Sequence, residues 1–134
     1  MPTEPTSGRA AADDFSTVVW PVEVRLKKEE KRLEIDFEDG RSFSLPAELL
    51  RVESPSAEVQ GHGPSQKTIV TGRRHVGIMA LEAVGNYALR IKFDDMHDTG
   101  IYSWQYLYKL GVTQDGVWQD YLDILTEEGL SRDP

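Results

Sequence analysis

The residues best able to do chemistry in this sequence are a histidine and three aspartates that lie close together along the chain. His97 follows Asp94 and Asp95 and precedes Asp98. A histidine among carboxylates can bind a transition metal or transfer a proton, and the nearby negative charges should favour its protonated form. We favour instead a structural role for His97 as a surface or turn residue hydrogen-bonded to the backbone. For the aspartates we favour a solvated turn over a cation site, because the calcium-loop pattern is absent.

Other motifs that carry chemistry are absent or incomplete. The chain has no cysteine, which excludes disulfides, a thiol nucleophile, a thiolate zinc site and a cysteine-ligated iron–sulfur cluster. The segment from Gly61 to Thr68 looks like a phosphate-binding loop, but Gln66 occupies the position of the second glycine and Ile69–Val70 favours a following strand. No serine lies in a Gly-x-Ser-x-Gly motif. We therefore expect no cofactor and no complete catalytic apparatus.

Alternation of apolar and polar residues predicts the strands that would position these side chains. Val22 to Leu26, Leu33 to Phe37 and Phe43 to Leu45 alternate with period two, and Asp39–Gly40 is typical of a hairpin turn. These segments predict an antiparallel meander. It should be followed by a short helix near residues 46–50, with its proline at the first helical position.

After this meander the sequence predicts irregular segments and further strands. Residues 52–65 contain two prolines and two glycines, and a loop this long inside a compact domain is often functional. A polar turn is expected over residues 94–100. The further strands are expected at residues 67–71, 76–84 and 87–93.

Helices should complete the C-terminal part of the chain. Ser103 can cap a helix that runs to Leu110 and ends at Gly111, and Val117 to Leu125 has the spacing of a last helix docked by one face. The aromatic residues of this region should lie in the core, with an aromatic binding wall as the alternative. The expected fold class is α+β: mainly antiparallel β meander or sheets, a short helix near residues 46–50 and one or two C-terminal helices.

The distribution of charge narrows the partners. The net charge is −8, but residues 1–19 carry −2 and residues 112–134 carry −5, so the stretch 20–111 is nearly neutral at −1. A body without a concentrated basic face does not fit nucleic acid. No apolar run approaches the ~20 residues that cross a bilayer, and Met1 to Ser16 lacks the pattern of a secretory signal. We therefore expect neither nucleic acid nor membrane as a partner, and a cytoplasmic location.

Within residues 20–111 three stretches carry a family resemblance. They are Leu50 to His62, with Ser-Pro-Ser-Ala-Glu, then Gly85 to Asp95, and His97 to Leu107, with His-x-x-Gly-Ile-Tyr-Ser-Trp. They resemble a bacterial family of unknown function that is similar to the N-terminal domain of γ-butyrobetaine hydroxylase. On this basis we expect a disordered tail at 1–17, a domain of that kind at 18–111, a C-terminal helix packing on it at 112–125 and a frayed tail at 126–134.

The resemblance implies a small, mainly β domain that precedes the catalytic oxygenase barrel and holds a structural zinc through three cysteines and one histidine. His97 matches that histidine, whereas the cysteines would fall near Ser54, Ser56 and Val59, where this chain has no thiolate. Similar domains are also fused to P-loop carriers of iron–sulfur clusters. The resemblance therefore implies an accessory role in which a partner supplies the chemistry.

The leading hypothesis is a non-catalytic binding or accessory module that serves a protein partner, either an iron–sulfur assembly protein or an oxygenase. Two alternatives stay open. One is a metal-binding protein that holds Zn or Fe through His97 with nearby carboxylates or His62, and the other is a small enzyme with convergent His and Asp groups. The sequence does not indicate the oligomeric state. The working surface should lie in residues 54–65 and 94–102, extended to one further aromatic residue: Ser54, Ser56, Glu58, Gln60, His62, Asp94, Asp95, His97, Tyr102 and Trp104.

Overall fold

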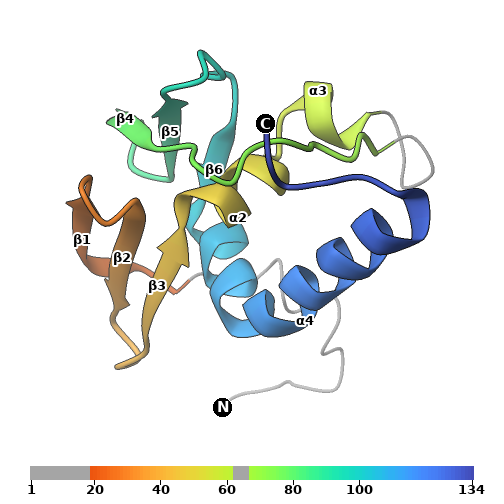
Figure 1. The fold of residues 1–134 in the computed structure, drawn as a ribbon. Coiled ribbons are helices and arrows are strands. Elements are labelled where there is room, and N and C mark those ends of the chain that lie inside the picture. The colour runs from red at the N-terminus through yellow and green to blue at the C-terminus, as the bar shows by residue number, and fades with distance from the viewer. Residues whose placement is uncertain (1–18, 62–66) are drawn as a thin grey trace.

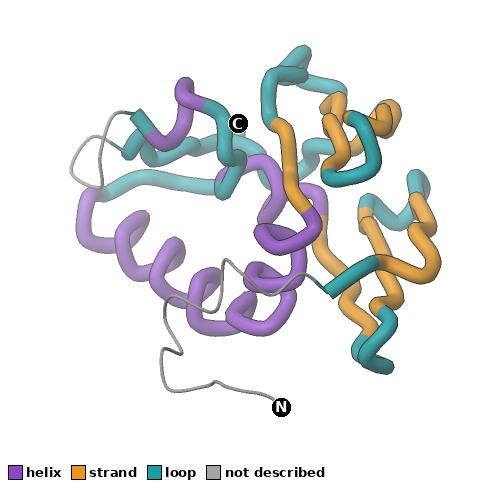
Figure 2. The backbone as a smooth tube through the Cα atoms, turned by 180° about the vertical axis from the view of Figure 1, so that it is seen from behind, coloured by secondary structure: helices purple, strands orange, loops and turns teal. Residues whose placement is uncertain are grey.

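A computed structural model describes residues 19–61 and 67–134 of the chain (Figure 1). The predicted N-terminal tail and His62 lie outside the described residues. Two three-stranded antiparallel sheets and a long C-terminal helix confirm the α+β fold class. Seen from behind, the strands gather on one side of the molecule and the helices on the other (Figure 2).

The first sheet is the meander that the sequence predicts. It contains β1 (Pro21–Lys27), β2 (Arg32–Phe37) and β3 (Ser42–Pro46) in the order β1-β2-β3. The hairpin between β2 and β3 turns at Gly40, whose φ of +89° is readily adopted by a residue without a β-carbon. Alternate residues of β2 are buried and their neighbours are half-buried, as the period-two pattern requires.

Two short helices follow the first sheet. Helix α2 (Ala47–Val52) begins directly after Pro46 and is buried along its whole length, which confirms the short helix predicted near residues 46–50. Helix α3 (Ala57–Gln60) is a single turn inside the segment that was predicted to be irregular. The prediction of a strand at residues 67–71 is wrong, because these residues have no regular secondary structure.

The second sheet consists of β4 (Ile78–Val84), β5 (Ala88–Phe93) and β6 (Ile101–Ser103), in the order β4-β5-β6. A tight turn joins β4 to β5, and the polar turn predicted at residues 94–100 joins β5 to β6. The core lies between the sheets and the helices. Its fully buried members come from both sheets, α2 and the last helix: Leu33, Ile35, Leu45, Leu50, Ile91, Tyr102 and Leu107.

A single helix, α4 (Trp104–Glu128), replaces the two shorter helices that the sequence suggested. Ser103 caps it as predicted, its hydroxyl accepting a 3.1 Å hydrogen bond from the N–H of Tyr106. Gly111 is not a helix end. A β-carbon at this position would overlap the ring of Phe43, so Gly111 permits the close approach of α4 to β3. Gly129, with φ +66°, forms the actual C-cap.

The residues after α4 fold back onto the body instead of fraying. The N–H of Gly72 donates to the carbonyl of Ser131, and that of Arg74 to the carbonyl of Arg132. Arg132 also forms a bidentate pair with the buried carboxylate of Glu48, at 2.7 and 2.8 Å. This pair satisfies a charge that would be costly to bury alone, so it anchors the C-terminal segment.

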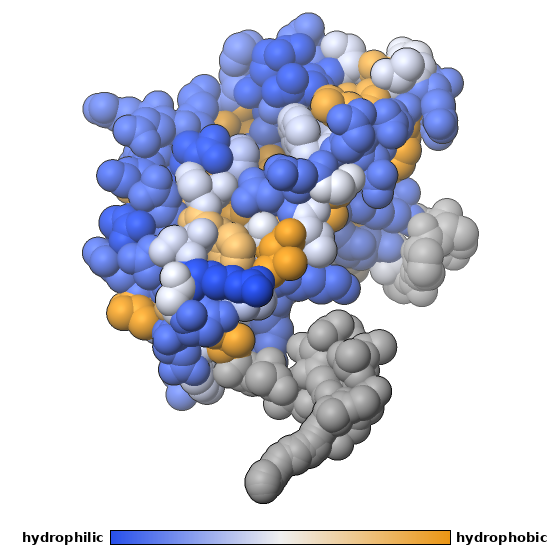
Figure 3. Space-filling model, turned by 90° about the horizontal axis from the view of Figure 1, so that it is seen from below, coloured by the Kyte–Doolittle hydropathy of each residue, from blue (hydrophilic) through white to orange (hydrophobic). Residues whose placement is uncertain are grey.

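Among the described residues, no helix combines the length and the apolar character that crossing a bilayer requires. The face shown in Figure 3 is mostly hydrophilic, and its hydrophobic side chains occur in small separate groups. That face therefore lacks the broad apolar patch that marks a large hydrophobic interface.

Candidate functional site

Two segments that are far apart in the sequence meet at His97. Ser54 and Ser56 lie in the loop between α2 and α3, and His97 lies in the turn between β5 and β6. Nε2 of His97 is 3.0 Å from Oγ of Ser54 and 3.4 Å from Oγ of Ser56, and the two hydroxyls are 3.2 Å apart. The three residues, which we name the Ser54–His97 cluster, are only 0%, 7% and 9% exposed. The structure thus brings together three of the predicted site residues in a buried position.

Backbone hydrogen bonds hold the His97 turn in one conformation. The N–H of His97 donates to Oδ1 of Asp95 at 3.0 Å, and the carbonyl of His97 accepts from the N–H of Phe93 at 3.0 Å. Between them Met96 adopts a φ of +76°, which is uncommon for a residue with a β-carbon. The turn is therefore a defined structure, and its strained residue is held in place by the bonds on either side of it.

Two arginines fix the carboxylate that supports this turn. Nε of Arg51 and Nε of Arg73 each lie 2.7 Å from Oδ2 of Asp95. Burial by itself would raise the pKa of Asp95, but the hydrogen bond from His97 and the two guanidinium groups outweigh it and lower the pKa. Asp95 is thus a charged structural anchor that ties the turn to α2 and to the segment before β4.

The environment of His97 favours the neutral ring, because other effects outweigh the carboxylates that the sequence places near it. Burial lowers the pKa of His97 and the positive charge of Arg51 lowers it further, whereas Glu58, Asp95 and Asp98 act in the opposite direction without prevailing. Nδ1 lies 3.4 Å from Oε1 of Glu58, which favours the tautomer with the proton on Nδ1. Nε2 then has one lone pair that can accept a hydrogen bond from a serine hydroxyl.

The order of groups Ser54, His97 and Glu58 is that of a catalytic triad, with a hydroxyl, an imidazole and a carboxylate in sequence. Access decides against nucleophilic catalysis at this site. Ser54 is fully buried, and a β-carbon added to Gly100 would lie 2.6 Å from its Oγ and 3.0 Å from the ring of Tyr102. No space remains for a substrate carbonyl above the hydroxyl, so these hydrogen bonds hold the segments together.

The same donors do not fit zinc. Zinc sites in proteins use thiolate, imidazole and carboxylate ligands, and a structural site needs four of them. The Ser54–His97 cluster offers one imidazole nitrogen and two neutral hydroxyls. Glu58 lies on the other side of the ring, beside Nδ1. Within residues 19–61 and 67–134, no three His, Cys, Asp or Glu side chains are grouped so that they could hold a metal ion.

The remaining predicted site residues have structural positions or lie at the surface. The side-chain amide of Gln60 donates to the carbonyl of Ser54 at 2.8 Å. Tyr102 is fully buried and its hydroxyl donates to the carbonyl of Leu50 at 2.5 Å, and the indole N–H of Trp104 donates to the carbonyl of Asn86 at 3.0 Å. The buried aromatics Tyr102 and Trp104 therefore belong to the core. Asp94 is exposed, as are residues 96, 98 and 99 of the same turn.

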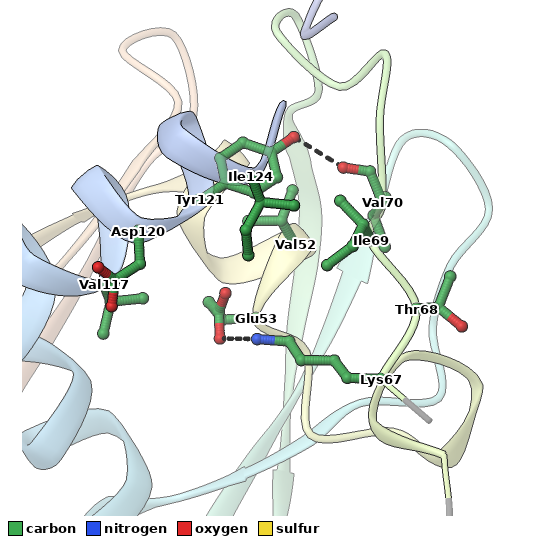
Figure 4. A pocket seen from close by; sticks show the side chains of 10 residues that line it. All are labelled: Val52, Glu53, Lys67, Thr68, Ile69, Val70, Val117, Asp120, Tyr121 and Ile124. Atoms are coloured by element: carbon green, nitrogen blue, oxygen red, sulfur yellow. Dashed lines mark hydrogen bonds and ion pairs between the residues drawn. The ribbon is translucent and has the colours of Figure 1, made fainter. Parts of the chain in front are cut away.

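The sequence did not predict a small pocket between the end of α2, segment 67–70 and α4 (Figure 4). Its volume is about 160 Å³, below the roughly 300–1,000 Å³ of typical ligand sites. Lys67 and Glu53 form a 2.7 Å ion pair in its wall, and the hydroxyl of Tyr121 donates to the carbonyl of Val70. The residues that line this α4 pocket come from the end of α2, segment 67–70 and α4: Val52, Glu53, Lys67, Thr68, Ile69, Val70, Val117, Asp120, Tyr121 and Ile124.

Comparison with known proteins identifies the relatives of this fold. The chain matches two structures solved by NMR in solution at 45% and 46% identity, each with a TM-score of 0.77, over 88% and 89% of this chain and 93% and 89% of theirs. It also matches a crystal structure of a protein of unknown function from Acidithiobacillus ferrooxidans, assigned to the DUF971 family, at 38% identity and TM-score 0.58. That match covers 68% of this chain and 91% of the other. The comparison with curated proteins gave no match.

The match to a family profile covers most of the region in which the sequence resemblance was found. Residues 24–108 match the profile described as gamma-butyrobetaine hydroxylase-like, N-terminal. This range includes the Ser54–His97 cluster, the start of α4 and both sheets. Only the first residues of β1 lie outside it among the strands. The chain therefore belongs to the gamma-butyrobetaine hydroxylase-like, N-terminal family.

Proposed function

We propose that this chain is a non-catalytic accessory module that binds a protein partner through the turn between β5 and β6 and the adjoining helix α3. The partner supplies the chemistry, and the candidates are an iron–sulfur assembly protein or an oxygenase. Two features of the described residues support a binding role over a catalytic one. The hydroxyl and imidazole groups at Ser54 and His97 are buried against each other, and the α4 pocket is smaller than typical ligand sites.

Met96 is the observation that carries this proposal. Its side chain is 82% exposed, the highest exposure among the large hydrophobic side chains of the described residues. It lies at the tip of a turn whose backbone is strained at this residue, with φ +76°, and held by hydrogen bonds on both sides. The combination of backbone strain with an exposed apolar side chain is what makes this turn a candidate contact point for a partner.

The surroundings of Met96 define the chemistry of the partner. Asp94, Asp98 and Thr99 of the same turn are exposed, and Oγ1 of Thr99 donates to Oε1 of the exposed Glu58 at 2.5 Å. We name these four residues and Met96 the turn surface. A flexible, polarizable methionine inside an acidic rim matches an apolar depression bordered by basic side chains. The partner should therefore present lysine or arginine around a hydrophobic hole.

Substitution of methionines on two different surfaces tests the proposal. Met96→Asp removes the apolar tip, whereas Met79→Asp makes the same change on β4, where the methionine is 54% exposed. Tagged wild-type and variant chains are used to capture proteins from native lysate, which are quantified by mass spectrometry, and the purified partner is then titrated by calorimetry. We expect Met96→Asp to weaken binding at least about tenfold, as for a central interface residue, with Met79→Asp unchanged.

The outcome that contradicts the proposal is equally specific. If Met96→Asp binds every captured protein as well as Met79→Asp does, the turn surface is not the binding site. Both variants should retain the wild-type melting temperature, because both side chains are exposed in the free chain. A salt titration of the purified complex sharpens the result, since an acidic rim facing a basic partner should lose affinity as ionic strength rises.

A further inference from the structure

We propose that Glu48 and Trp118 form a binding site for the guanidinium group of an arginine carried by an extended peptide segment. In this structure Arg132 of the chain's own C-terminal segment, residues 130–134, occupies the site. A partner whose extended segment carries an arginine takes the place of that segment. The inference does not rest on the turn surface, because the two sites share no residue.

The guanidinium group of Arg132 is recognised both at its edge and on its face. Its Nε and Nη2 donate to the two carboxylate oxygens of Glu48 at 2.8 and 2.7 Å. The ring of Trp118 covers the same group, with its centroid 5.2 Å from Cζ. A planar fork that pairs with a carboxylate and also stacks on an aromatic ring is a property of arginine that lysine does not share. The site is therefore selective for guanidinium over ammonium.

Both groups that recognise the arginine belong to the body of the fold. Glu48 lies on α2, and its side chain is only 8% exposed. Trp118 lies on α4 and packs against the buried ring of Tyr121, with 5.2 Å between the centroids. A buried carboxylate that loses its cation is strongly unfavourable. The body of the fold therefore favours a cation at this place, and another segment can supply it as well as residue 132.

The C-terminal segment contributes one partly buried side chain to this contact, and its other residues are exposed. Its backbone runs alongside the segment that leads to β4 (Figure 1). The carbonyl of Ser131 accepts from the N–H of Gly72 at 3.1 Å, and the next carbonyl accepts from the N–H of Arg74 at 3.0 Å. An ion pair of Arg74 with Asp133 is exposed and adds little. Backbone contacts that any extended chain can make, combined with one specific side chain, are typical of peptide recognition.

The segment can leave the site without unwinding α4. The N–H groups of Gly129 and Leu130 donate to the carbonyls of Thr126 and Leu125, so the helix end is capped before the chain reaches Ser131. A segment attached to its own site by a short linker has an effective concentration in the millimolar range. A free peptide therefore competes poorly with the wild-type segment, and removal of the Arg132 side chain should open the site.

The test supplies a guanidinium group to the full chain after its own has been removed. Arg132→Ala is melted with ethylguanidinium or ethylammonium chloride at equal millimolar concentrations. We expect the melting temperature to rise with ethylguanidinium only, because a ligand that binds the folded chain stabilises it. The double variant Glu48→Gln/Arg132→Ala should not respond. Neither should the matched control Arg25→Ala, which loses a bidentate pair with the more exposed carboxylate of Asp36.

A labelled peptide with the sequence of residues 130–134 extends the test from the side chain to a peptide segment. Binding is measured by fluorescence anisotropy. The peptide should bind Arg132→Ala at least about tenfold more tightly than it binds wild type, whose own segment occupies the site. It should also bind at least about tenfold more tightly than the same peptide with lysine in place of arginine.

Four outcomes would overturn the inference. They are no response of Arg132→Ala to ethylguanidinium, an equal response to both cations, an equal response of the double variant, and equal affinities of the two peptides. A wild-type chain that binds the arginine peptide as tightly as Arg132→Ala does would also overturn it, because the peptide would then bind elsewhere. If Arg132→Ala does not fold, Arg132→Gln, whose amide can donate one hydrogen bond to Glu48, replaces it in the same comparisons.

Discussion

The connection between α2 and β4 contributes to both the Ser54–His97 cluster and the α4 pocket, and the two are built in opposite ways. In the cluster, a buried imidazole and two hydroxyls are packed closely together. At the pocket, segment 67–70 lies over α4 and borders a space of about 160 Å³, with aliphatic and polar side chains in its wall (Figure 4). The groups that could react and the space that could hold a ligand are thus in different places.

Elementary energetics explain this separation. Polar groups taken out of water must find partners, so the serines and the histidine are drawn into direct contact and close the space between them. Aliphatic side chains such as Val52 and Ile124 make no directional bonds and tolerate a small void at modest cost. A triad-like order of residues is therefore insufficient evidence for catalysis, because the same hydrogen bonds that align the groups can also exclude a substrate.

Addition of one carbon next to the Ser54–His97 cluster should have the largest effect. Gly100→Ala places a β-carbon 2.6 Å from Oγ of Ser54 and 3.0 Å from the ring of Tyr102, so loop or ring must move. We expect a loss of about 3 kcal/mol in the free energy of unfolding. Gly116→Ala in α4, where nothing lies within 4 Å of the new carbon, should instead gain about 1 kcal/mol. Urea denaturation of both variants checks this, and equal effects would show that the cluster is not tightly packed.

Removal of the central hydroxyl should have the next largest effect. Ser54→Ala removes the donor to Nε2 of His97 and the acceptor of the Ser56 N–H at 3.3 Å, which leaves buried polar atoms with weaker partners. The expected cost is about 2 kcal/mol. Ser42→Ala removes an exposed hydroxyl that donates to Asp36, and it should change stability by less than about 0.5 kcal/mol. A Ser54→Ala variant as stable as Ser42→Ala would contradict the role assigned to the cluster.

The sequence predicted the strands better than the contacts. Val22 to Leu26 and Leu33 to Phe37 form strands as expected, and in the second of them burial of one sheet face enforces the alternation, which is a local property of the sequence. Gly111 misled the helix prediction because its role depends on Phe43, far away in the sequence, whose ring contacts the helix at that point. Residues 67–70 have the composition of a strand but lie over α4 without a partner strand in the described residues.

The candidate site shows the same division. The residues of the cluster were named from the sequence, but the contact between Ser54 and His97 depends on how the loop after α2 reaches the β5–β6 turn. The carboxylates near His97 favour its charged form, as the sequence predicts, but burial and Arg51, which come from the tertiary fold, outweigh them and lower the pKa of His97. Met96 was missed because a methionine between acids has no sequence signature, and its exposure and positive φ appear only in the folded turn.

The neutral His97 should make the stability of the fold sensitive to acid. Its pKa is lowered in the folded chain, so between that value and the unfolded value near 6.5 the unfolded chain binds more protons. The free energy of unfolding should therefore fall as the pH drops below about 6.5. Glu58, Asp95 and Asp98 favour the charged ring and reduce this fall without cancelling it. Asp95, whose pKa is also lowered, adds a further loss below about pH 4.

Melting temperatures measured from about pH 7 to pH 5 check this expectation. His97→Gln should flatten the decline in that range, because the group that titrates there is removed. His75→Gln changes an exposed histidine outside the cluster and should leave the decline as in the wild type. A decline that persists in His97→Gln and disappears in His75→Gln would contradict the expectation, because the acid sensitivity would then come from His75 and not from the cluster.

The smallest effect is expected where the structure has space. Val117→Ile adds one carbon to the wall of the α4 pocket, the counterpart of adding one carbon at Gly100. If the carbon enters the pocket it buries one methylene, which should stabilise the fold by up to about 0.8 kcal/mol, measured by urea denaturation. Asp120→Asn, at the exposed rim of the same pocket, should be close to neutral. Destabilisation by Val117→Ile would mean that segment 67–70 packs on α4 as tightly as the serines pack on His97, because neither the α4 pocket nor the cluster would then have space for one more carbon.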